Sequence, residues 1–107
     1  MKKQHIKNFT KGWFIGDFAP SLVHTREFEV AVKYYQKGDR DDVHYHKIAQ
    51  EYTVFVAGVF SINGERYTTG DIIHFEPNDI SKFECIEDGA TVVVKIPSVA
   101  GDKYIVE

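Results

Sequence analysis

The chain has 107 residues, of which 43% are hydrophobic and 14% aromatic. It can therefore bury one hydrophobic core without disulfides, and it is too short for two domains. Thirteen Lys and Arg residues against sixteen Asp and Glu residues leave a net charge of -3 without a basic run, which disfavours nucleic acid as a partner. The single cysteine, and the lack of any stretch of roughly 20 apolar residues, favour a cytoplasmic protein without a membrane partner.

The chain is expected to form one all-β domain over residues 1–107, because β-branched and aromatic residues alternate with turn residues at short intervals. Residues 1–27 carry Trp13 and Phe14 among glycines and are expected to pack on the barrel or on a partner subunit. Residues 28–97 are expected to form the barrel core. The strands predicted there cover residues 28–35, 51–57, 59–62, 65–67, 71–75 and 91–96.

Glycine-containing turns are predicted to separate these strands. Asn63 and Gly64 form the strongest hairpin signal, because both residues of an Asn-Gly pair can adopt positive φ. Gly58 is predicted to end one strand, and the segment 87–89 is predicted to form a turn before the last one.

A candidate metal site lies between the first two predicted strands of the core. His44 and His46 are two residues apart, so an extended chain points both imidazoles to the same side, and Glu51 can approach from the next strand. Two imidazoles and one carboxylate are typical of open sites for Fe, Mn, Ni, Zn or Cu, and the sequence does not choose among these metals. The alternative is that both histidines are hydrogen-bonded pocket residues.

The spacing around these residues is Gly38, five residues, His44-Tyr45-His46, four residues, Glu51, six residues and Gly58. It resembles the first conserved motif of the cupin superfamily, with every interval matched. The resemblance implies a small single-domain cupin with a double-stranded β-helix, also called a jelly-roll barrel. It further implies one divalent transition metal on His44, His46 and Glu51, and a homodimer.

Residues 70–85 are similar to the second cupin motif, more loosely, and keep its opening glycine at Gly70. Ser81 stands where the family has its fourth ligand, a histidine, so the fourth position carries a much weaker ligand. A three-ligand site with an extra open position is one outcome, and loss of the metal is the other. A register slip of one residue would place Lys82 there instead.

Strand alternation predicts which side chains face the interior. It points Ile73 and Phe75 inward and His74 outward, and it places Ser81 and Cys85 on one side, with Cys85 as a buried inert thiol. A compact and mostly apolar pocket for a small-molecule ligand is expected, lined by Thr53, Phe55, Phe75 and Phe83.

Three functions from different classes fit these features. The first is a metal-dependent enzyme of oxygenase, isomerase or lyase type that acts on a small molecule. The second is a non-catalytic cupin module that binds a sugar or another small molecule. The third is an oligomerisation or interaction domain. The sequence identifies neither the substrate nor any catalytic residue, because fold alone does not determine function.

Overall fold

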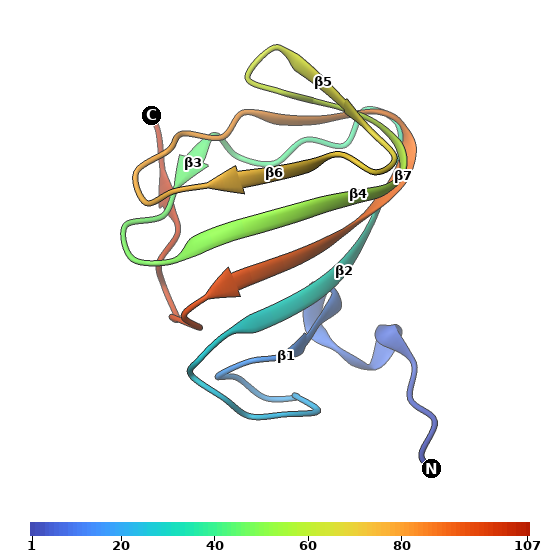
Figure 1. The fold of residues 1–107 in the computed structure, drawn as a ribbon, viewed down its shortest axis with the longest axis vertical. Coiled ribbons are helices and arrows are strands. Elements are labelled where there is room, and N and C mark those ends of the chain that lie inside the picture. The colour runs from blue at the N-terminus through green and yellow to red at the C-terminus, as the bar shows by residue number, and fades with distance from the viewer.

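Two long strands, β4 (Gln50–Ile62) and β7 (Phe83–Ile96), form the frame of the fold in the computed structural model, which describes residues 1–107 (Figure 1). They pair antiparallel along their whole length, from Gln50 opposite Ile96 to Ile62 opposite Phe83. Both are rich in valine, phenylalanine and threonine, which favour the pleated backbone.

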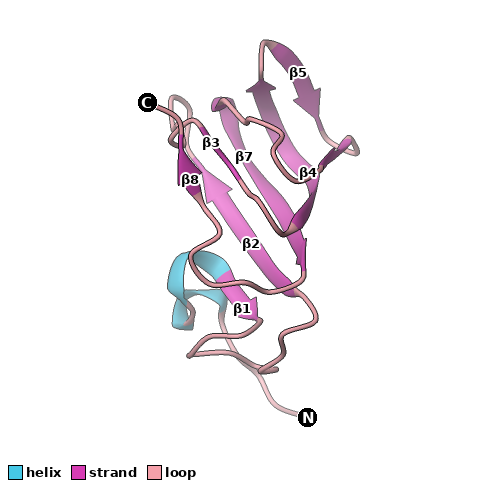
Figure 2. Cartoon of the chain, turned by 90° about the vertical axis from the view of Figure 1, so that its left-hand side faces the viewer, coloured by secondary structure: helices cyan, strands magenta, loops and turns pink.

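The remaining strands extend this pair on both sides. β1 (Trp13–Ile15) pairs with β2 (Glu29–Tyr35), and β2 pairs with β7. On the other side, β5 (Glu65–Thr68) and β6 (Ile72–Phe75) both pair with β4, while β3 (His44–Tyr45) and β8 (Tyr104–Ile105) form a separate two-stranded sheet. Figure 2 shows β2, β7 and β4 lying side by side. Only two 3₁₀ turns, Ile6–Asn8 and Thr10–Gly12, are helical, and no helix is long and apolar enough to span a bilayer.

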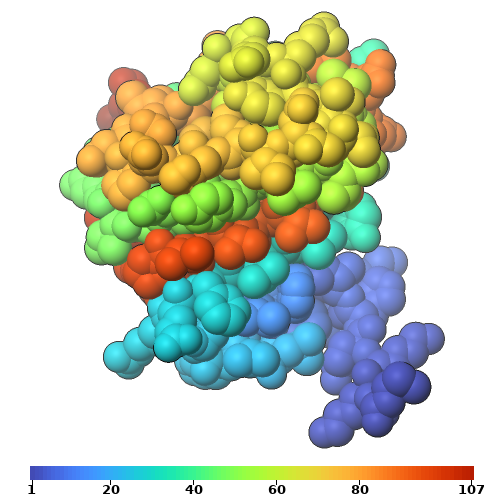
Figure 3. Space-filling model, viewed as in Figure 1, coloured from blue at the N-terminus to red at the C-terminus, as the bar shows by residue number.

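The all-β prediction is therefore confirmed, as is the hairpin at Asn63 and Gly64, whose φ values are 52° and 83°. The N-terminal segment packs on the barrel through β1, although its first residues extend away from the body in Figure 3. Strand pairing reaches beyond residues 28–97 at both ends, because β1 and β8 also take part.

The predicted strand end at Gly58 and turn at residues 87–89 are wrong. β4 and β7 both run through these positions, with an irregular register between Phe55 and Phe60. A Cβ atom on Gly58 would lie 2.5 Å from the Asp88 carbonyl oxygen, and one on Gly89 would lie 2.2 Å from the Ala57 carbonyl oxygen. The glycines therefore let the two backbones approach closely and bend together while remaining paired.

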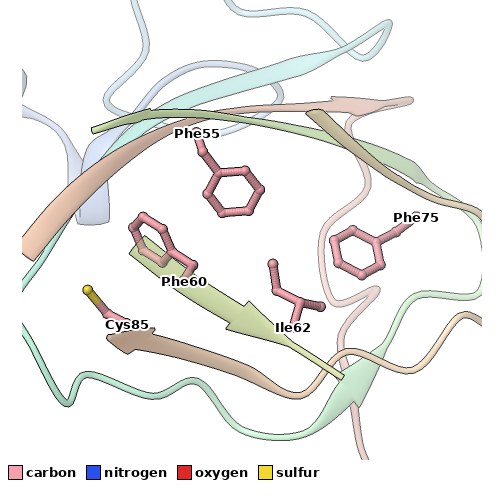
Figure 4. Close-up of a cluster of buried hydrophobic side chains, with 5 residues drawn as sticks. All are labelled: Phe55, Phe60, Ile62, Phe75 and Cys85. Atoms are coloured by element: carbon pink, nitrogen blue, oxygen red, sulfur yellow. The ribbon is translucent and has the colours of Figure 1, made fainter. Parts of the chain in front are cut away.

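This bend places the two halves of β4 on opposite sides of the core. Phe55 from the first half contacts Phe60 from the second, with ring centroids 5.0 Å apart. Figure 4 shows both rings pointing into the interior with Ile62, Phe75 and Cys85. Cys85 is 1% exposed, and burial raises the pKa of its thiol, so the structure confirms the expected buried thiol.

Candidate metal centre

A cavity of about 210 Å³ lies among the inner faces of the strands, and its wall contains His44, His46, Glu51 and Ser81. The sequence motifs thus bring all four predicted positions to one cavity. Ser81 is buried and Lys82 is exposed, as expected from the gapless register of the second motif.

Backbone pairing fixes where each of these side chains points. His44 lies in β3 and exchanges two backbone hydrogen bonds with Ser81, at 3.2 and 2.8 Å, so the two residues face each other directly. Glu51 lies in β4 between Phe75 of β6 and Lys95 of β7. Its alternate neighbour Thr53 also faces inward and donates its hydroxyl hydrogen to Glu51 at 3.3 Å.

Both imidazole rings are held by backbone carbonyls. The Nδ1 atom of His44 lies 2.6 Å from the carbonyl oxygen of Asp42, and the Nδ1 atom of His46 lies 2.7 Å from that of Asp102. Because a carbonyl only accepts, each Nδ1 carries a hydrogen, and in the neutral tautomer the lone pair lies on Nε2. This is the arrangement that carbonyl partners commonly impose on histidine ligands of metals.

The Nε2 atom of His46 is buried and has no hydrogen-bond partner, although it lies 3.6 Å from Oε1 of Glu51. The rings of His44 and His46 have their centroids 5.1 Å apart. Burial lowers the pKa of His44 and outweighs the opposite effect of the Asp42 carbonyl and the Asp41 carboxylate, which keeps this ring neutral near pH 7.

Glu51 is held as a carboxylate. Burial by itself would raise its pKa, but the nearby His46 ring and the charge of Lys95 bring the pKa below its ordinary value. Neutral imidazoles and an ionised carboxylate are the forms that bind a divalent transition metal, so the donor chemistry fits such an ion. No three His, Cys, Asp or Glu side chains are grouped tightly enough to hold a metal, so joint ligation by His44, His46 and Glu51 stays a prediction.

Asp102 supports this site and was missed in the sequence. Its carboxylate accepts hydrogen bonds from the backbone amides of Lys47, Ile48 and Ala49 at 2.9 to 3.2 Å, and it is 6% exposed. Its carbonyl holds His46, as described above. One residue therefore fixes both the ring of His46 and the turn that leads to Glu51. No local motif marks it, because it follows His46 by 56 positions.

Lys95 was also missed, although the alternation of the predicted strand 91–96 places it on the inner face. Its Nζ atom lies 3.9 Å from Oε1 of Glu51 and 4.0 Å from Oε1 of Glu29. The three residues occupy one row across β2, β7 and β4. An ammonium group thus lies beside the carboxylate of the candidate site.

The expectation of a mostly apolar pocket is wrong, because only 7 of the 18 residues that line the cavity are hydrophobic and several of the others are charged. Thr53, Phe75 and Phe83 line the cavity, but Phe55 does not. Phe55 is fully buried in the core, because Tyr67 stacks on its ring at 5.2 Å and Phe60 packs beside it. The core thus fills the part of the barrel around this ring.

The outward orientation predicted for His74 is confirmed. His74 is exposed, donates from Nε2 to the Gln50 side chain at 2.7 Å, and stacks on Tyr52 with ring centroids 4.3 Å apart. It takes no part in the cavity.

The chain forms an antiparallel barrel on two bent strands, and a His-x-His segment lines its cavity. These features place it among the double-stranded β-helix folds. More particularly, it has the cupin fold, as solved structures show. It is similar to an uncharacterized conserved protein with a double-stranded β-helix domain from Klebsiella pneumoniae subsp. pneumoniae, with a TM-score of 0.68, 22% identity and 80% of each chain covered.

A second similar structure is an RmlC-like cupin from Shewanella frigidimarina, with a TM-score of 0.63, 22% identity and 70% of each chain covered. A third is the DMSP lyase DddQ from Ruegeria pomeroyi, with a TM-score of 0.69 and 16% identity, where the match covers 82% of this chain and 47% of that one. No protein-family model matches the sequence, and no curated protein matches it. These identities establish the fold alone.

Proposed function

We propose that the protein binds one divalent transition metal through His44, His46 and Glu51, with Ser81 at the fourth position, and acts on a small molecule at that site. The observation that carries this proposal is the buried Nε2 of His46, which has no partner. Leaving a buried polar atom unpaired costs about 1–3 kcal/mol, and a metal ion would offset this cost. The structural similarity to a lyase supports an enzymatic role.

The bound metal would act as a Lewis acid with open positions for substrate or water, as in oxygenase, isomerase or lyase sites. The chain itself supplies the orientation. The carbonyls of Asp42 and Asp102 direct the two imidazoles, while Thr53 donates to Glu51 and limits its rotation. Ile73, Phe75 and Phe83 give the cavity apolar walls that restrict water around a bound substrate.

The proposal is tested by elemental analysis of protein purified without an affinity tag, followed by titration with Mn, Fe, Ni, Zn and Cu. We expect about one ion per chain, and a much weaker site in the Glu51→Gln variant. If no metal binds above background and Glu51→Gln matches the parent, the metal site is excluded.

The second candidate function is metal-free binding of a sugar or another small molecule. It is favoured by the hydroxyl of Ser81 where cupins have an imidazole, and by Lys95, which places a cation 3.9 Å from Glu51. Ligand binding that is unchanged by removal of all metal would favour this candidate.

Replacing Ser81 with histidine is expected to tighten metal binding by about tenfold or more, because it adds a strong ligand opposite His44. Ser81→Ala should bind metal as the parent does if the hydroxyl is not a ligand. Isothermal titration of the parent and both variants measures these differences. Lys82→His is the matched control, because Lys82 is exposed; a gain confined to this variant would contradict the register.

We also propose that the protein forms a homodimer through the outer face of its main sheet. One row across β2, β7, β4 and β6 consists of Val32, Val92, Val54 and Ile72, and Ile72 is 64% exposed. Burying such an apolar face against a second copy removes it from water. Light scattering at micromolar concentration should give about twice 12.3 kDa for the parent and a monomer for Ile72→Lys. A parent that is monomeric contradicts the proposal.

A further inference from the structure

The cavity is lined by four lysines, Lys11, Lys33, Lys95 and Lys103, against only two carboxylates, Asp41 and Glu51. This excess of positive charge is local, because the whole chain has a net charge of -3. Lys103 is already paired, since its Nζ atom lies 2.8 Å from Oδ1 of Asp41. Lys11, Lys33 and Lys95 therefore account for the positive charge of the rest of the cavity wall.

Lys33 has no carboxylate partner. It lies on β2 two residues beyond buried Ala31, so both side chains face inward. Its Nζ atom donates only to the carbonyl of Lys11, at a long 3.4 Å. Burial, followed by repulsion from Lys95, lowers the pKa of Lys33. Two ammonium groups thus lie near enough to disfavour each other.

Lys95 is only loosely paired. Its Nζ atom lies 3.9 and 4.0 Å from Glu51 and Glu29, beyond ordinary hydrogen-bond length. The pair of Lys33 and Lys95 therefore lacks a closely bound anion on the protein.

The two ammonium groups share one aromatic neighbour. The Nζ atoms of Lys33 and Lys95 lie 5.0 and 5.1 Å from the ring centroid of Trp13, which also lines the cavity. Cation–π contacts of this length stabilise each lysine and restrict its position. Both cations therefore adjoin the ring of Trp13, although they come from different rows of the sheet, Lys33 opposite Thr91 and Lys95 opposite Glu29.

We propose that Lys33 and Lys95 form a subsite for the anionic oxygens of a small ligand, a carboxylate or a phosphate, whose compact apolar body packs against Ile73, Phe75 and Phe83. The proposal rests on the proposed function only in placing the other end of this ligand near His46 and Glu51. The cavity volume of about 210 Å³ is below that of sites for drug-sized ligands, which restricts the ligand to a small organic anion.

Trp13 is the only tryptophan of the chain, so its emission reports on this subsite. The test titrates the full chain, first stripped of metal with EDTA and then loaded with Zn²⁺, at constant ionic strength. The probes are isobutyrate, its neutral analogue isobutyramide, and inorganic phosphate. Ligand-observed NMR is recorded in parallel, so that binding without a change in emission is also detected.

We expect isobutyrate or phosphate to bind the metal-free protein at least tenfold more tightly than isobutyramide, and the stronger of the two identifies the preferred anion. Lys33→Met keeps the length of the side chain and should weaken anion binding at least tenfold. Lys95→Met provides a second variant if the first does not fold by circular dichroism. Lys82→Met, at an exposed position outside the cavity, should bind as the parent does.

The outcomes separate this subsite from the metal site. Anion binding that Lys33→Met abolishes supports the subsite even if no metal binds. Equal binding of isobutyrate and isobutyramide, or anion binding unaffected by both lysine variants, overturns it. If Zn²⁺ binds while no anion does, the subsite is wrong and the metal site stands.

Discussion

Replacing His46 with alanine is expected to lower the affinity for a divalent transition metal by about 100-fold or more. Loss of the supporting partner of a ligand already costs about 10–100-fold, and removing the ligand itself should cost at least as much. His46 carries the unpaired, buried Nε2 atom that lies 3.6 Å from Glu51, and alanine offers no ligand atom at that position. Competition with a chromophoric chelator measures the affinity.

His74→Ala is the matched control, because His74 is exposed and remote from the cavity, and its affinity should equal that of the parent. A second readout is thermal unfolding. Saturating Zn²⁺ should raise the melting temperature of the parent and of His74→Ala but not that of His46→Ala, since ligand that binds only the folded state stabilises it. Equal metal affinity in His46→Ala and the parent would show that the histidines are pocket residues only.

Replacing Asp102 with alanine is expected to lower the free energy of unfolding by about 2–4 kcal/mol, because three backbone amides lose a charged acceptor at once. Urea denaturation in the presence of EDTA measures this loss without any contribution from metal. The control is Asp79→Ala, which removes one exposed hydrogen bond to the Glu76 amide and should cost less than about 1.5 kcal/mol. Equal losses in both variants would contradict the role of Asp102.

The contribution of Asp102 should also depend on pH. Burial alone would raise its pKa, but the hydrogen bonds from Ala49, Lys47 and Ile48 outweigh burial and hold the pKa below the ordinary 3.8. A carboxyl group with a lowered folded-state pKa stabilises the fold above its unfolded pKa and loses that effect as the pH falls through the folded value. The stability difference between parent and Asp102→Ala should therefore be largest near neutral pH and shrink below about pH 4. A difference that is the same at pH 7 and pH 3 would contradict this mechanism.

Local patterns were sufficient to predict the fold class and the positions around the cavity. The spacing of His44, His46 and Glu51 placed all three on one wall, because two-residue periodicity holds wherever the backbone is extended. The resemblance of residues 70–85 to the second cupin motif implied that Ser81 faces inward, and the same register leaves Lys82 outside. The hairpin at Asn63 and Gly64 was predictable because its turn depends only on those two residues.

Features that depend on a distant partner could not be predicted in this way. Gly58 ends a strand when judged by its neighbours in sequence, yet β4 continues because Gly89 of β7 bends at the same place. Phe55 was placed in the pocket because alternation gives the side of a strand but not the depth of a side chain. Lys33 and Trp13 meet at the cavity only because β1 pairs with β2.

The dependence of His46 on Asp102 has a consequence for the order of events during synthesis. A ribosome makes His44, His46 and Glu51 about fifty residues before Asp102, and β8, which pairs with β3, follows later still. Until then the ring of His46 has no carbonyl to orient it, and the amides of residues 47–49 have no acceptor. The growing polypeptide therefore exposes His46 before the residue that orients its ring has been made, and the wall of the cavity is complete only after β8 has emerged and paired with β3.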